Sequence, residues 1–73
     1  MERLGTTHRI AQGLAIVKVD DVPDIGTEVV DDQLDEVGSV VDVFGPVSEP
    51  YAAVSPRSDR SLAPLIGQPL YLR

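Results

Sequence analysis

The sequence predicts an all-β fold, a small barrel of six short strands formed as a single domain over residues 1–73. Valine occupies eleven of the 73 positions, and β-branched residues favour strands. Six glycines and six prolines interrupt the chain at short intervals, a pattern typical of short strands joined by turns. Sustained helical periodicity is missing, and a sandwich of two sheets normally needs about 100 residues. A closed or partly closed barrel remains, because in it one sheet covers its own apolar face.

Six segments of strand length lie between turn signals and define the predicted strands. They cover residues 3–10, 14–19, 27–30, 37–44, 51–55 and 70–72. The turn sequence Ala-Gln-Gly at 11–13 separates the first two strands, so these should form a hairpin. Pro23 and its polar neighbours place residues 20–26 in a loop, and the polar run 31–36 is predicted to be a turn.

The run 37–44 gives the clearest strand signal. In a regular strand Val37, Val41 and Val43 project to one face, and the even-numbered residues project to the other. The Gly-Pro pair that follows ends the strand, because proline lacks the N–H that a ladder needs.

The last connection, residues 56–67, is longer than the others. We expect its Leu62, Leu65 and Ile66 to form one helical turn that packs on the core before the final strand.

The formal net charge of −6 argues against a surface that binds nucleic acid by itself, since such affinity depends mainly on Lys and Arg. Residues 1–49 hold 11 acidic and 3 basic residues, so the acidity lies in the first two thirds of the chain. Lys18 is the single lysine beside five arginines, a balance found in proteins of high-salt cytoplasms. The carboxylates of residues 20–36 do not follow the spacing of a calcium loop and are expected to form a solvated face that holds no metal.

Catalysis is not expected. The chain has no cysteine, its one histidine, His8, has no nucleophile motif around it, and no glycine-rich phosphate loop or cofactor motif is present. The longest apolar run is four residues, so neither a membrane span nor a signal peptide is predicted, and we expect a cytoplasmic protein.

Two of the three aromatic residues, Phe44 and Tyr51, flank the turn of the segment FGPVSEPY. Taken alone, each would more commonly be a core residue. However, Pro46 and Pro50 stiffen this apolar turn, and a rigid apolar turn loses little entropy when it docks on a protein.

Residues 37–56, VGSVVDVFGPVSEPYAAVSP, resemble the central signature of the small β-barrel subunit of H/ACA ribonucleoproteins, the family with glycine- and arginine-rich tails. The segments RLGTTHRIAQGLAIVK, IGTEVVDDQL and LIGQPLYL follow in the order typical of that family, so the resemblance covers nearly the whole chain. The arginine-rich tails of eukaryotic members are missing, and the chain resembles the minimal archaeal form.

The resemblance implies a six-stranded barrel related to a translation-factor β-barrel domain. It further implies a non-catalytic subunit that docks on the pseudouridine synthase of the H/ACA particle, contacts guide RNA and rRNA substrate only indirectly, and helps control the loading and release of substrate RNA. The positions that match the family signature are Gly38, Asp42, Phe44, Gly45, Pro46, Val47, Pro50 and Tyr51.

Within that set, the expected protein interface is Phe44, Pro46, Val47 and Tyr51. The glycines are expected to act as backbone hinges and Asp42 to cap a turn. The alternative is a free-standing nucleic-acid-binding barrel of the oligonucleotide-binding or ribosomal type, which would need a basic groove with exposed aromatic side chains.

Overall fold

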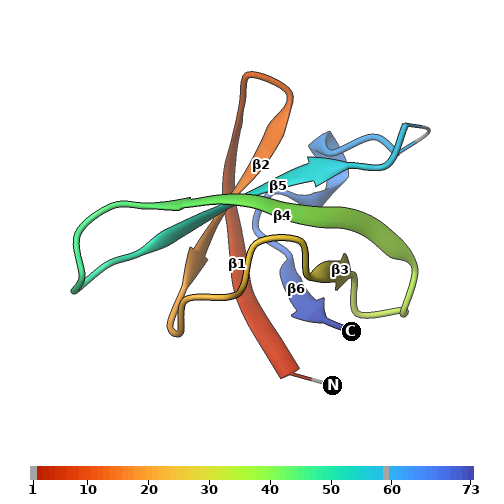
Figure 1. The fold of residues 1–73 in the computed structure, drawn as a ribbon. Helices are drawn as coiled ribbons and strands as arrows, with labels where there is room; N and C mark the ends of the chain where they lie inside the picture. Colours follow the sequence, from red (N-terminus) through yellow and green to blue (C-terminus); the bar gives the residue numbers. More distant parts are fainter. Residues whose placement is uncertain (1, 59) are drawn as a thin grey trace.

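The structure, a computed structural model, describes residues 2–58 and 60–73 and is a closed barrel of six antiparallel strands (Figure 1). The strands are β1 (Glu2–Ala11), β2 (Leu14–Val19), β3 (Glu28–Val30), β4 (Glu36–Phe44), β5 (Tyr51–Pro56) and β6 (Pro69–Leu72). They are hydrogen-bonded in the order β1-β2-β5-β4-β3-β6, and β6 pairs with β1 to close the barrel. The predicted fold class is therefore confirmed, and each strand end agrees with the predicted one or differs from it by one residue.

The predicted β1–β2 hairpin is present, but its turn has two residues rather than the three predicted at 11–13, because Ala11 still pairs with Leu14. Gln12 and Gly13 both have positive φ, 53° and 76°, and two successive positive φ values give the turn the twist that neighbouring strands require. The N-terminal end of β1 extends past the strand pairing with β2 and pairs with β6.

The interior is aliphatic. Its central cluster consists of Leu4, Ala15, Val17, Val19, Val29, Val37, Val40, Ala52, Val54, Leu62, Leu65 and Leu70. Burying such side chains is the main driving force for folding, and small valines and alanines suit the narrow inside of a six-stranded barrel.

The alternation predicted for the fourth strand is wrong at Val40, which lies in the core with Val37, and at Val41. The register of β4 on β5 shifts between Val40 and Asp42, so Val41 is an extra residue in a β-bulge. As a result Val40 is buried in the core, whereas Val41 is 43% exposed. Val43 returns to the inner face beyond the bulge, where it packs against the core as predicted.

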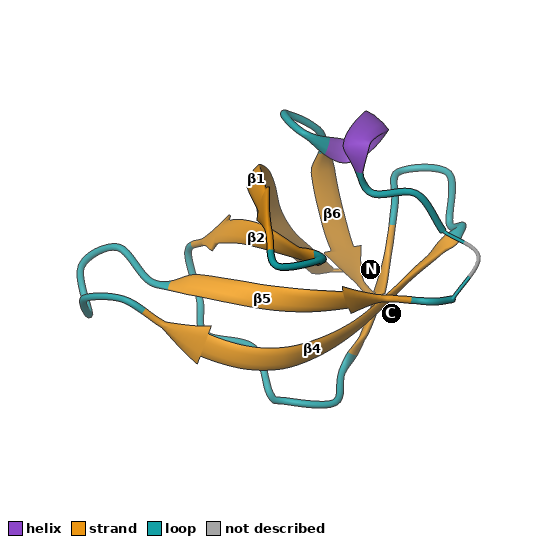
Figure 2. Ribbon diagram, turned by 90° about the horizontal axis from the view of Figure 1, so that it is seen from above, coloured by secondary structure: helices purple, strands orange, loops and turns teal. Residues whose placement is uncertain are grey.

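The connection between β5 and β6 contains one short 3-10 helix, η1 (Ala63–Leu65), seen above the strands in Figure 2. Leu62 and Leu65 are buried there as predicted, but Ile66 is 51% exposed. The chain leaves η1 at Ile66 in an extended conformation, with φ −57° and ψ 127°, which takes this residue out of the helical turn. No helix within the described residues is long and apolar enough to cross a membrane.

Thr7 brings a polar group into the barrel. Its side chain is 1% exposed, and in the described part of the chain its Oγ1 has no hydrogen-bond partner. Valine has nearly the same shape and lacks the hydroxyl. We therefore expect Thr7→Val to raise the free energy of unfolding by about 1 kcal/mol, measured from urea unfolding curves.

Thr6→Val serves as the matched control for this change, because Thr6 is only half buried and its Oγ1 accepts a hydrogen bond from Arg3 Nη2 at 2.9 Å. The free energy of unfolding of Thr6→Val should stay within about 0.5 kcal/mol of the wild-type value. A lower stability of Thr7→Val would show that the hydroxyl is satisfied in the folded protein.

Candidate functional site

The turn between β4 and β5 projects beyond the body of the barrel (Figures 1 and 2). We call residues 44–51 the aromatic turn. Gly45 has a φ of 96°, which favours glycine, and Glu49 N–H donates to Pro46 O at 3.0 Å. Such local constraints make the backbone of the aromatic turn rigid.

Two contacts hold the base of the aromatic turn on β2. The N–H of Val19 donates to Pro50 O at 3.2 Å, and Lys18 Nζ lies 2.9 Å from Glu49 Oε1. The hydrogen bond to Glu49 and the negative charge of that carboxylate raise the pKa of Lys18, and the same contact lowers the pKa of Glu49. Both groups are therefore charged over the neutral pH range.

The apolar side chains of the aromatic turn lie mostly in solvent. Val47 is fully exposed and Phe44 is 40% exposed, whereas Tyr51 is half buried and Pro50 is buried. Phe44 and Tyr51 face each other across the β4–β5 pair, and their rings stack with centroids 5.8 Å apart at an angle of 19°. The structure thus places Phe44 outside the core, in contrast to the usual position of such a residue.

The predicted site residues separate into two groups. Phe44, Gly45, Pro46, Val47, Pro50 and Tyr51 all belong to the aromatic turn. Gly38 and Asp42 lie on the body of β4. Asp42 is at the β-bulge, where its Oδ1 accepts the N–H of Val43 at 2.8 Å, and Gly38 faces the Ser55 carbonyl so closely that a Cβ there would overlap its oxygen.

Sequence reasoning missed the surface beside the aromatic turn. His8 and Arg9 on β1 and Ile16 on β2 line, with Phe44 and Tyr51, a hollow of about 140 Å³ on the outside of the barrel. Ile16 lies between two core residues of β2 and so points to the outer face of the sheet, where it pairs in register with Arg9 and is only 6% exposed. The His8 ring lies 5.9 Å from the Tyr51 ring. The alternation of β2 was the available signal for Ile16.

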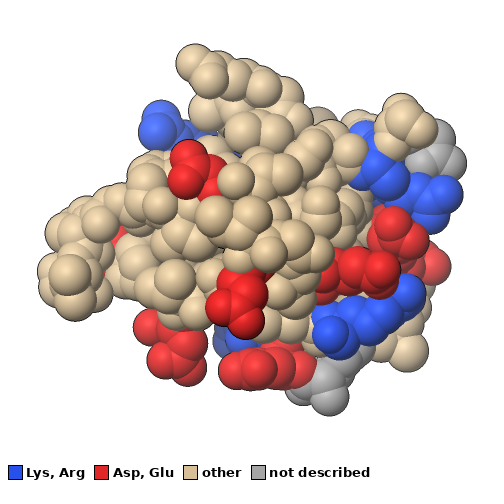
Figure 3. Space-filling model, viewed as in Figure 1, with Lys and Arg blue, Asp and Glu red and all other residues tan. Residues whose placement is uncertain are grey.

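Apart from Glu49 with its partner Lys18, and Arg9 at the neighbouring hollow, most charged residues lie away from the aromatic turn. In Figure 3 the projecting turn is largely uncharged, while acidic and basic side chains lie mainly along the lower and right-hand edges. Three of the eight carboxylates of residues 20–36 contact an arginine of the described chain: Asp31 with Arg60, Glu28 with Arg73, and Glu36 with Arg57. Among the described residues no group of three histidine or acidic side chains converges as a metal site would require.

The contact between Asp31 and Arg60 joins the β3–β4 turn to the β5–β6 connection. Arg60 Nη2 donates to Asp31 Oδ2 at 2.8 Å, and the N–H groups of Gln33 and Asp35 donate to Oδ1. Burial raises the pKa of Asp31, but these hydrogen bonds and the charge of Arg60 outweigh it, so the pKa lies below its ordinary value. The carboxylate thus links the β3–β4 turn to the β5–β6 connection.

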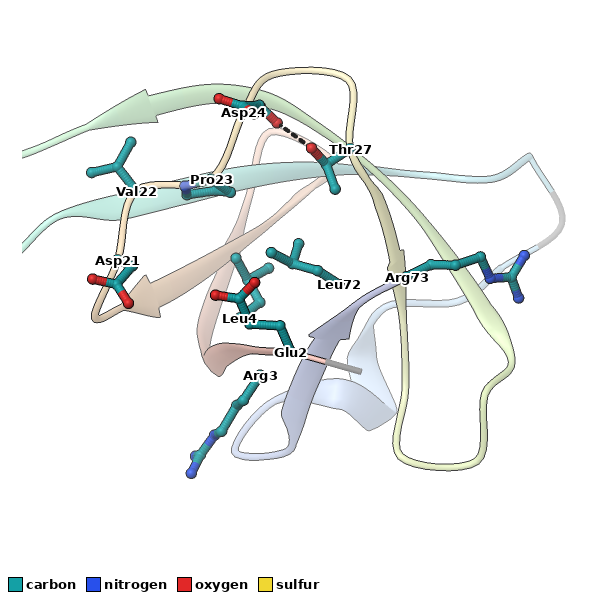
Figure 4. A pocket seen from close by; sticks show the side chains of 10 residues that line it. All are labelled: Glu2, Arg3, Leu4, Asp21, Val22, Pro23, Asp24, Thr27, Leu72 and Arg73. Atoms are coloured by element: carbon teal, nitrogen blue, oxygen red, sulfur yellow. Dashed lines mark hydrogen bonds between the residues drawn. The ribbon is translucent and has the colours of Figure 1, made fainter.

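A larger hollow, of about 300 Å³, lies at the end of the barrel where the two termini meet (Figure 4). Acidic and basic side chains mix along its walls, and Arg3 and Arg73 point away from each other. Arg73 is held by Glu28, with Nη1 and Oε2 3.2 Å apart. These charges do not converge on a common point, so the aromatic turn and the neighbouring hollow remain the stronger candidate.

Comparison with known proteins agrees with this description. The family model described as Gar1/Naf1 RNA binding region matches residues 1–73. No curated protein matches the chain in sequence. The resemblance inferred from the sequence is thereby confirmed at the level of the family. Because the match spans all 73 residues, the chain belongs to the Gar1/Naf1 RNA-binding-region family.

Proposed function

We propose that this protein is the non-catalytic β-barrel subunit of an H/ACA ribonucleoprotein and that it docks on the pseudouridine synthase subunit through Phe44, Pro46, Val47 and Tyr51. In that position it assists RNA-guided rRNA pseudouridylation by acting on the loading and release of substrate RNA. Family membership supports the type of particle. The main observation that supports this docking surface is the exposed apolar aromatic turn, with Val47 fully exposed at its tip.

The rigidity of the aromatic turn supports docking. Association loses side-chain and loop entropy, and this loss is smaller when the bound conformation exists beforehand. Here two prolines flank the tip, Glu49 N–H donates to Pro46 O across it, and the Lys18–Glu49 contact holds its base. Stacked aromatic residues that are partly exposed are typical anchors of protein interfaces.

The charges of the barrel favour indirect rather than direct contact with RNA. Four of the six basic side chains have a carboxylate within ion-pair distance: Lys18, Arg57, Arg60 and Arg73. Release of phosphate counterions depends on basic groups that are available to the nucleic acid, and here few are. In this proposal the family's RNA binding is therefore a property of the assembled particle. The alternative function is that of a free-standing nucleic-acid-binding barrel, which would bind RNA by itself.

Titration separates the two functions. The purified protein is titrated with the synthase subunit alone and, separately, with guide RNA alone, at an ionic strength of about 0.15 M. We expect submicromolar binding of the synthase and at least about 100-fold weaker binding of the RNA. Submicromolar binding of RNA together with no measurable binding of the synthase would establish the alternative.

A further inference from the structure

Arg9 differs from most basic residues of this chain. Four of the six are paired with carboxylates, but within residues 2–58 and 60–73 neither Arg9 nor Arg3 contacts an acidic side chain. Arg9 is exposed and lines the hollow of His8, Ile16, Phe44 and Tyr51. In a chain of net charge −6, an arginine without an acidic partner at the edge of a partly apolar hollow is a complementary site for an anionic group of another molecule.

The hollow as a whole has the size of one side chain. A cavity of about 150 Å³ accommodates a ring as large as benzene. The hollow, at about 140 Å³, therefore suits one aliphatic or aromatic side chain. Its floor is apolar, because Ile16 is an outward-facing aliphatic residue between the strands that carry Arg9 and Tyr51.

The ring geometry disfavours a nucleobase as the occupant. Single-stranded RNA is bound by stacking bases on free aromatic faces. Tyr51 has the stacked Phe44 ring and the tilted His8 ring near it, at 5.8 and 5.9 Å. The Tyr51 ring thus already has two aromatic neighbours, and the acidic chain repels the phosphates that would accompany a base.

We propose that this hollow is the anchor of the docking surface: it takes one apolar side chain of the synthase, and Arg9 pairs with a carboxylate next to that side chain. The inference rests on the proposed function and deepens it. It extends the interface from the aromatic turn to the outer face of β1 and β2.

The test compares three arginine variants in the synthase titration. Arg9→Glu reverses the charge at the hollow, Arg9→Lys keeps it, and Arg3→Glu makes the same change in net charge elsewhere on β1. We expect Arg9→Glu to weaken synthase binding at least about 10-fold, and the other two variants to stay within about 3-fold of the wild type. Unfolding curves show that each variant is folded.

Each other outcome has a distinct meaning. Equal losses for Arg9→Glu and Arg3→Glu would reflect net charge alone, and unchanged binding by Arg9→Glu would place the interface elsewhere; both results overturn the inference and leave the proposed function intact. Failure of the wild type to bind the synthase overturns both. If Arg9→Glu instead abolishes submicromolar binding of a fluorescent single-stranded RNA and leaves synthase binding unchanged, the hollow is an RNA site and the inference is wrong.

Discussion

Replacing Gly38 by alanine is expected to unfold much of the protein. The new Cβ would overlap the carbonyl oxygen of Ser55 on β5, and this obstacle is backbone rather than a movable side chain. Relief requires β4 and β5 to separate where Gly38 pairs with Pro56. Overpacking of this kind costs about 3 kcal/mol or more, a large part of the roughly 5 kcal/mol that stabilises a domain of this size. Thermal unfolding monitored by far-UV circular dichroism measures the loss.

Gly13→Ala is the matched control for this change. Gly13 has a positive φ of 76°, but no atom lies within 4 Å of the Cβ that alanine would add. Alanine there meets only the strain of the left-handed conformation, about 1–2 kcal/mol. If the Gly38→Ala protein is as stable as the Gly13→Ala protein, β4 and β5 separate easily, and glycine is not required at position 38.

The strands and their turns could be predicted from local sequence because their signals are local. The apolar runs, the Gln12–Gly13 turn and the Gly45-Pro46 stop all act within a few residues. The bulge at Val41 could not be predicted in this way. It depends on the register of β4 against β5, and the valines at 40 and 41 are equally apolar neighbours.

The candidate site likewise has one part that local sequence predicts and one part that depends on strand pairing. The aromatic turn is one continuous segment, so its residues were found together in the sequence. The hollow beside it joins Arg9, Ile16 and Tyr51 from three strands, which become neighbours only through the pairing of β1 with β2 and of β2 with β5. Its unpaired arginine is recognised only after the ion pairs of the other basic residues are known, and these involve residues as far apart as Asp31 and Arg60.

Truncating the aromatic turn should reduce binding while the barrel stays folded. Phe44→Ala is expected to weaken synthase binding by about 2 kcal/mol or more, roughly 30-fold, because partly exposed aromatic residues at the centre of an interface are common hot spots. A buried phenylalanine would lose about 3–5 kcal/mol of stability on truncation, but Phe44 is 40% exposed and should lose much less. Unfolding midpoint and synthase affinity are measured on the same protein.

Val47→Asp gives the sharper test, because Val47 is fully exposed and its replacement should leave stability within about 0.5 kcal/mol of the wild type. A carboxylate buried without a partner at an apolar contact is costly, so we expect binding to fall at least as far as for Phe44→Ala. Val22→Asp makes the same change at an exposed valine of the β2–β3 loop, outside the aromatic turn, and should bind like the wild type. If Phe44→Ala and Val47→Asp are folded and bind the synthase as tightly as Val22→Asp does, the docking surface lies on another face of the barrel.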